Sequence, residues 1–156
     1  KLPLNMPILR FIYGTRKEGF PNHYLNQGQR VAGTFRTRNA FPLYIVRLPH
    51  EDRAPWLVHL PGEGHQVTGE VFEVDDAALP AMDAFEEVGR PTGYLRVEIE
   101  LDAGPGHATP LRAQAYMKHA DQLPACLERE GPFAEYTLAL ATGYRIEMPG
   151  AAPLDG

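Results

Sequence analysis

Two short segments of the sequence combine residue types that can do chemistry. The first is residues 13–19 (YGTRKEG), where an apolar, β-prone run ends at a glycine. Gly14 lets the backbone approach a ligand closely, and successive backbone N–H groups in such a turn can form a nest for a carboxylate. The same pattern also fits a turn that simply ends a strand, so the residues alone leave both interpretations open.

The second segment is residues 82–87 (MDAFEE), at the end of a predicted helix. Glu86 follows Phe85, which belongs to an apolar stripe, so we expect its carboxyl group at the edge of the core. Partial burial would raise the affinity of this group for protons, as a general base that works near neutral pH requires. An exposed glutamate at a helix end fits the pattern too, and the adjacent Glu87 is a competing candidate.

Other catalytic chemistries find little support. The chain has no serine, which excludes every serine-nucleophile mechanism, and its one cysteine, Cys126, can form neither an internal disulfide nor a CxxC pair. Absent disulfides favour a cytoplasmic protein. His59 and His65 flank Glu63, but Pro61 breaks the helix that an HExxH metal site needs. We therefore expect these histidines to hold no metal, and keep a histidine-based metal hydrolase as an alternative.

Charge and composition exclude further classes of function. The formal net charge is −5, from 15 basic and 20 acidic residues, so a clustered basic face for nucleic acid is not expected. Residues 14–19 have the glycine spacing of a P-loop, but Phe20 and Pro21 stand where lysine and a hydroxyl residue are needed. No apolar run approaches the roughly 20 residues that span a bilayer, so no membrane segment is expected.

The elements that position these residues form one predicted domain, residues 6–148. Met6 resembles a natural start, so residues 1–5 are expected to precede the native chain, and residues 149–156 are expected to be a loose tail. The predicted strands and helices do not alternate strictly as βαβ units, which argues against a doubly wound parallel sheet. We therefore expect an α+β fold, with a small mixed sheet curled or closed into a β-barrel and flanking helices. The expected strands are 8–13, 31–37, 42–46, 56–60, 67–74, 94–101 and 111–117, and the expected helices are 75–87 and 133–143.

Several motifs resemble the γ-glutamylcyclotransferase-like superfamily, most closely its γ-glutamylamine cyclotransferases. Any one motif is weak, but they occur in the family's order between residue 8 and about residue 101. Within the superfamily, segment 55–62 resembles the γ-glutamylamine cyclotransferases in particular. The matching segments are 13–19 (YGTRKEG), 21–23 (PNH), 42–46 (PLYIV), 55–62 (PWLVHLPG), 67–75 (VTGEVFEVD) and 82–86 (MDAFE).

The resemblance implies a small mixed β-barrel that converts a γ-glutamyl compound to 5-oxoproline and releases an amine, often the side-chain amine of lysine. The substrate's own α-amine is the nucleophile, which agrees with the missing serine. A small γ-glutamyl molecule is the only partner implied, and neither a metal nor a cofactor is implied. The helix-end glutamate is the family's acid/base, here Glu86. The glutamyl-binding positions map to Tyr13, Gly14, Thr15 and Arg16, and the pocket tyrosines to Tyr94 and Tyr116.

The sequence departs from the family pattern at three places. Arg16 replaces a leucine beside the glutamyl pocket, Ala84 replaces an acidic residue, and the spacing between Glu86 and Tyr94 indicates an insertion. Two alternatives therefore stay open beside γ-glutamylamine chemistry. One is a cyclotransferase for γ-glutamyl amino acids or a biosynthetic intermediate, and the other is a silent ligand-binding domain of the same fold.

Overall fold

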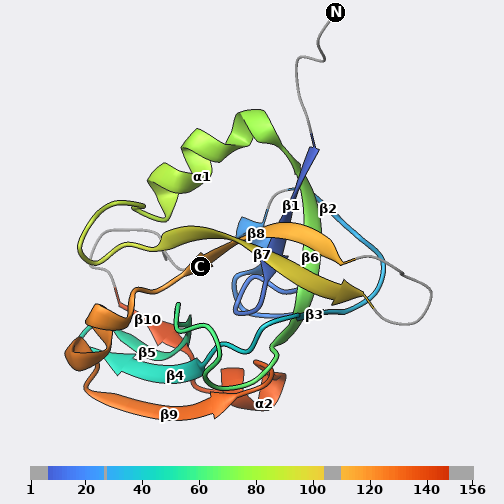
Figure 1. Cartoon of the computed structure of the whole chain (residues 1–156). Helices are drawn as coiled ribbons and strands as arrows, with labels where there is room; N and C mark the ends of the chain where they lie inside the picture. Colours follow the sequence, from blue (N-terminus) through green and yellow to red (C-terminus); the bar gives the residue numbers. More distant parts are fainter. Residues whose placement is uncertain (1–6, 27, 104–109, 148–156) are drawn as a thin grey trace, which may run out of the picture.

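The computed structural model describes residues 7–26, 28–103 and 110–147, which form ten strands with short helices between them (Figure 1). The strands are β1 (Pro7–Ile12), β2 (Gln29–Arg30), β3 (Phe35–Thr37), β4 (Leu43–Leu48), β5 (Glu51–Leu57), β6 (Thr68–Asp75), β7 (Leu95–Ala103), β8 (Leu111–Met117), β9 (Glu128–Phe133) and β10 (Arg145–Ile146). The helices are η1 (His23–Leu25), η2 (Asp76–Ala78), α1 (Leu79–Phe85), η3 (Ala120–Ala125) and α2 (Leu138–Ala141).

Strand β1 closes a ring of strands. It pairs antiparallel with β6, from Pro7 opposite Asp75 to Ile12 opposite Glu70, and parallel with β8 at Arg10. The order β1-β8-β7-β3-β6 therefore returns to β1, and β2 adds to the edge of β6. Because β1 lies at the junction of two neighbours, its side chains are fixed from both sides.

A second sheet, in the order β10-β5-β4-β9, lies apart from this ring. Figure 1 shows it at one end of the molecule and α1 at the other, with β1, β6, β7 and β8 between them. The predicted α+β class is confirmed. The predicted barrel is only partial, because β3 contributes three residues to the ring and four strands form the separate sheet.

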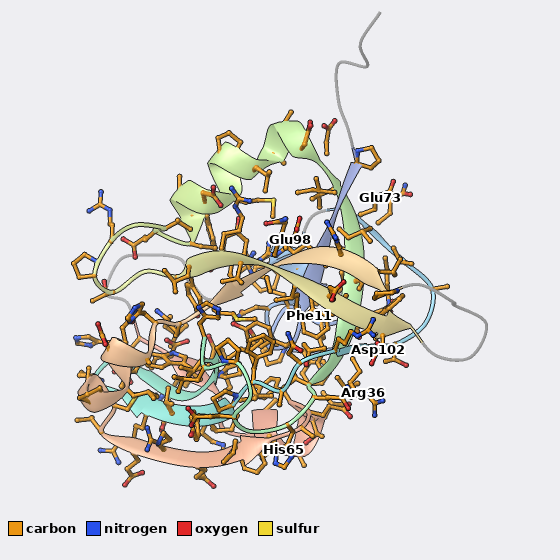
Figure 2. The ribbon with its side chains drawn as sticks, in the orientation of Figure 1. Phe11, Arg36, His65, Glu73, Glu98 and Asp102 are labelled. Atoms are coloured by element: carbon orange, nitrogen blue, oxygen red, sulfur yellow. The ribbon has the colours of Figure 1, made fainter. Side chains whose placement is uncertain are left out.

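The core fills the space inside the ring and between the two sheets. Fully buried side chains from the ring include Phe11 and Leu101, and those from the second sheet include Leu43 and Leu57. Figure 2 shows Phe11 amid the strands, whereas the exposed Arg36 lies nearer the outside of the molecule. One continuous apolar cluster thus joins both sheets.

The predicted helix 75–87 forms, but it is shorter and irregular. The side chain of Asp75 accepts a hydrogen bond from the N–H of Ala77, which caps the 3-10 turn η2. Pro80 is tolerated because it stands in the first turn of α1. The predicted place of Phe85 in a buried apolar stripe is wrong, since Phe85 is 39% exposed and Met82 is the buried residue of α1.

The predicted helix 133–143 is wrong for most of its length. Residues up to Phe133 pair with β4 as strand β9, and the N–H of Thr68 then donates to the carbonyl of Ala134. Tyr136 is fully buried against Phe20, so the chain stays extended until Thr137 caps the short helix α2. Tertiary pairing outweighs helix propensity in this segment.

Some expectations lie outside the described residues, namely those for residues 1–5 and for the tail 149–156. Within the described residues, no helix has the length and apolar character needed to span a membrane.

The side chain of Thr37 secures the short strand β3, and its loss should destabilise the fold. Its hydroxyl accepts a hydrogen bond from the N–H of Val67 at 2.8 Å and donates to the carbonyl of Asn39 at 2.7 Å. Thr37→Val keeps the shape but orphans a buried donor, so we expect a loss of about 1–3 kcal/mol in the free energy of unfolding, measured in urea. Thr34→Val, at an exposed position nearby, should cost less than about 0.5 kcal/mol. Equal stabilities of the two variants would contradict this role.

Candidate active site

Glu86 is buried at the point where α1 ends, with 3% of its surface exposed. Its N–H donates to the carbonyl of Met82, and its own carbonyl accepts from the N–H of Tyr94, both at 3.0 Å. The segment between them folds back tightly, because a Cβ on Gly93 would lie only 1.8 Å from the carbonyl oxygen of Glu87. The glycine therefore permits a loop that fixes Glu86 and Tyr94 relative to each other.

Two arginines compensate the buried carboxylate. An Arg16 guanidinium nitrogen donates to Oε1 of Glu86 at 3.0 Å, and an Arg10 guanidinium nitrogen lies 3.7 Å from the same oxygen. Both arginines are about as buried as Glu86, with 4% of Arg10 and 3% of Arg16 exposed. Burial favours a neutral carboxyl group, whereas adjacent cations favour the ionised form.

Aromatic rings cover both guanidinium groups. The Arg16 guanidinium lies 4.8 Å from the centre of the Phe85 ring, and that of Arg10 lies 4.9 Å from the Tyr116 ring. Nε of Arg10 is buried and has no hydrogen-bond partner among the described residues. Burial and the nearby charge of Arg16 lower the pKa of Arg10, and the charge of Glu86 opposes this shift.

Tyr13 and Tyr116 connect β1, β8 and α1. The Tyr13 hydroxyl donates to the carbonyl of Tyr116 at 2.6 Å, and the Tyr116 hydroxyl donates to Oδ1 of Asp83 at 2.7 Å. Arg96 holds the same Asp83 oxygen at 2.9 Å. Burial and the hydrogen bond to Asp83 raise the pKa of Tyr116, so the phenol stays protonated. The phenol therefore serves as a hydrogen-bond donor that anchors α1.

The turn after β1 is tightly bonded. The N–H of Lys17 donates to the carbonyl of Gly14 at 3.1 Å, and the N–H of Asn22 donates to the carbonyl of Thr15 at 2.8 Å. The Asn22 side chain also donates to the Thr15 hydroxyl. The turn thereby holds Arg16 against Glu86, although 70 residues separate them in the sequence.

A cavity of about 580 Å³ opens in front of Glu86. It lies where the segment between α1 and β7 meets the β4–β5 turn and the segment that follows β8. Its walls are mainly apolar and aromatic, with several charged groups at intervals. Six of the lining residues are discussed below: Trp56, Phe85, Glu86, Glu87, Tyr94 and Lys118.

The structure brings most of the predicted site residues together. Glu86 and Tyr94 line the cavity, and Arg16 lies directly against Glu86. Tyr13 and Tyr116 stand behind this pair and do not line the cavity. Gly14 and Thr15 lie in the turn that carries Arg16, likewise outside the lining. Glu87 also lines the cavity but is exposed, with φ at 55°.

Sequence reasoning missed Arg10 and Lys118. Arg10 is a single charge inside an apolar strand segment (ILRFIY), which could have indicated a buried ion pair. Lys118 follows the strand 111–117 with no local pattern to mark it. Among the residues that the structure describes, no group of three or more histidine, cysteine, aspartate or glutamate side chains could hold a metal ion.

The buried pair of Arg16 and Glu86 should be strongly coupled. In a double-mutant cycle of Arg16→Leu and Glu86→Gln, we expect a coupling of about 1–3 kcal/mol in the free energy of unfolding, because both groups are desolvated. The exposed pair of Arg47 and Glu128, 3.4 Å apart, is the matched control and should couple by less than about 1 kcal/mol. A buried pair that couples no more strongly than the surface pair would contradict this geometry.

Comparison with known proteins agrees with this arrangement. Residues 10–135 match the family described as Gamma-glutamyl cyclotransferase, AIG2-like. A gamma-glutamylaminecyclotransferase from Homo sapiens is 41% identical over 111 residues, which are 65% of this chain and 69% of that protein. The one from Rattus norvegicus is 45% identical over 97 residues, 58% of this chain and 61% of the relative, so the aligned part spans less than two thirds of the rat protein.

The fold agrees as well. The crystal structure of an AIG2-like protein from Mus musculus superposes with a TM-score of 0.70 at 31% identity, covering 94% of this chain and 99% of the mouse chain. The matched range includes every residue of the candidate site, from Arg10 to Lys118. The chain therefore belongs to the gamma-glutamyl cyclotransferase, AIG2-like family.

Proposed function

We propose that this chain is a γ-glutamylamine cyclotransferase, which closes the γ-glutamyl group of its substrate into 5-oxoproline and releases the amine. The observation that carries the proposal is a buried glutamate, Glu86, at the wall of a cavity large enough for such a substrate. Relatives named gamma-glutamylaminecyclotransferase at 35–45% identity support the substrate class.

The reaction needs no nucleophile from the protein. The α-amine of the substrate attacks its own γ-carbonyl carbon, and the C–N bond to the leaving amine then breaks. Such an intramolecular attack benefits from an effective concentration on the order of 10⁵ M or more when the geometry is right. The enzyme has to fold the substrate, remove a proton from the α-ammonium group and supply one to the leaving nitrogen.

Glu86 is the proton acceptor in this proposal. The guanidinium groups of Arg16 and Arg10 favour its ionised form before the reaction, so that it can accept the proton of the α-ammonium group. When the carboxyl group becomes protonated, the ion pair with Arg16 weakens. This favours return of the proton and resets the site.

The remaining predicted residues bind or position the glutamyl group in this proposal. Tyr94 faces the cavity beside Glu86, and the turn of Tyr13, Gly14 and Thr15 carries Arg16, whose charge suits an anionic substrate. Tyr116 is a positioning residue, since its hydroxyl anchors Asp83 on α1. A cytoplasmic location and independence of cofactors remain predictions from the sequence.

Replacing Glu86 should slow turnover strongly and leave enough folded protein to test. Glu86→Gln is expected to lower kcat/KM for 5-oxoproline release from ε-(γ-glutamyl)lysine by about 10²–10⁴-fold, the usual contribution of a general base. Glu87→Gln is the matched control at the adjacent position and should change the rate little. An active Glu86 variant, or an inactive Glu87 variant, would overturn the assignment of the acid/base.

A second substrate distinguishes the two cyclotransferase classes. We expect release of 5-oxoproline from ε-(γ-glutamyl)lysine and much less from γ-glutamyl-alanine under the same conditions. Release from γ-glutamyl-alanine alone would move the chain to the class that acts on γ-glutamyl amino acids. Release from neither would favour the silent binding domain and reject the proposed function.

A further inference from the structure

Lys118 places a buried amine in the same cavity as Glu86, and the reaction as described does not use it. Only 6% of its surface is exposed. Its Nζ donates to the carbonyl of Thr92 at 2.9 Å and lies 4.0 Å from the centre of the Tyr94 ring and 5.0 Å from that of Trp56. All three neighbours also line the cavity. One donor of the ammonium group is thus engaged, in a wall that faces the substrate space.

The backbone fixes Lys118 firmly. Its N–H donates to the carbonyl of Leu57 at 2.8 Å, and its carbonyl accepts from the N–H of His59 at 2.9 Å. The residue is therefore held against the end of β5, directly after β8. A side chain rooted in this way can be placed as accurately as a catalytic group requires.

Groups from several segments act on this amine electrostatically. Glu51 on β5, Glu86 and Glu87 after α1, and Cys126 after η3 all act on Lys118 electrostatically, and His50 lines the same cavity. Burial lowers the pKa of Lys118 to about 8, and the four acidic groups oppose the shift. An amine in this range can both hold and give up a proton near neutral pH.

The chemistry of the leaving group requires such a donor. An alkylamine cannot depart as an amide anion, so its nitrogen must gain a proton before or while the C–N bond breaks. In the proposed reaction Glu86 accepts the proton of the attacking α-amine. Without a second group, this one carboxyl group would also have to supply the proton to the leaving nitrogen. A second group in the cavity that can donate a proton would let Glu86 serve the attacking nitrogen alone.

We propose that Lys118 donates the proton to the departing amine while Glu86 accepts the proton of the attacking amine. The inference rests on the proposed function. A proton moves from the Lys118 ammonium to the leaving nitrogen, the electron pair of the C–N bond goes to that nitrogen, and the carbonyl of 5-oxoproline re-forms. Neutral Lys118 then recovers from Glu86, directly or through water, the proton that Glu86 took from the α-ammonium group. The attacking nitrogen loses its second proton to water as the new C–N bond forms, so protons and charge balance over one cycle.

Two substrates with different leaving groups test this assignment. ε-(γ-Glutamyl)lysine releases a basic alkylamine that needs a proton, whereas γ-glutamyl-p-nitroanilide releases a weakly basic aniline that departs without strong acid assistance. Lys118→Met is expected to lower kcat/KM for the lysine compound by about 10²–10⁴-fold and that for the anilide by less than about tenfold. The ratio of the two rates cancels any loss of folded protein.

Two further variants make the test specific. Lys118→Arg keeps the charge but cannot give up its proton, so it should fail to restore the lysine substrate. Arg112→Met, at an exposed position on β8, should leave both rates unchanged. Equal losses for both substrates in Lys118→Met, or full activity of Lys118→Arg, would overturn the proton-donor role. A wild-type protein inactive on both substrates would instead reject the proposed function, and this inference with it.

The pH dependence provides a second readout. Lys118 donates only when protonated, so its contribution is present below its pKa of about 8 and is lost as the pH rises through that value. For the wild-type protein, we expect the rate with the lysine compound, relative to that with the anilide, to fall above pH 8. In Lys118→Met this relative rate should not change with pH, and a parallel fall in the variant would contradict the assignment.

Discussion

The buried carboxylate of Glu86 can exist only because cations accompany it into the core. A lone carboxylate in an apolar environment would take up a proton or return to water, at a cost of several kcal/mol. Arg16 at 3.0 Å and Arg10 at 3.7 Å remove this penalty, and aromatic rings cover both guanidinium groups. The site is therefore built around a cluster of three charged groups. Its position in the molecule is the place where Glu86, Arg10 and Arg16 can come together.

The meeting place is set by β1. This strand pairs with β6 on one side and β8 on the other, so Arg10 on the strand and Arg16 in the following turn cannot shift independently of the ring. The end of α1 brings Glu86 to them, held by Tyr116 through Asp83. The cavity then forms at the junction of the ring with the second sheet, where Leu57 holds the backbone of Lys118. Residues of both sheets and of their connections therefore line it, among them Trp56 of the second sheet and Lys118 after β8.

The sequence predicted those features that depend on local pattern or on motif order. Strand 111–117 agrees with β8 at both ends, and the α+β class and family were correct. Burial of Glu86 was predicted for a wrong reason, because Phe85 is exposed beside the cavity and Glu86 itself turns inward. Segment 133–143 was wrong because its pairing partners in β4 and β6 are distant in the sequence. Arg10 and Lys118 were missed for the same reason, since their partners lie up to 76 residues away along the chain.

The central claim is that ring closure takes place in the cavity in front of Glu86. The most direct measurement is an experimental structure of the protein with 5-oxoproline bound. We expect the five-membered ring in this cavity, with its nitrogen or carbonyl oxygen within hydrogen-bond distance of the Glu86 carboxyl group and Tyr94 beside it. Product bound elsewhere, for example in the smaller cavity between Lys17 and Glu70, with the Arg16–Glu86 pair undisturbed and remote from it, would contradict the account.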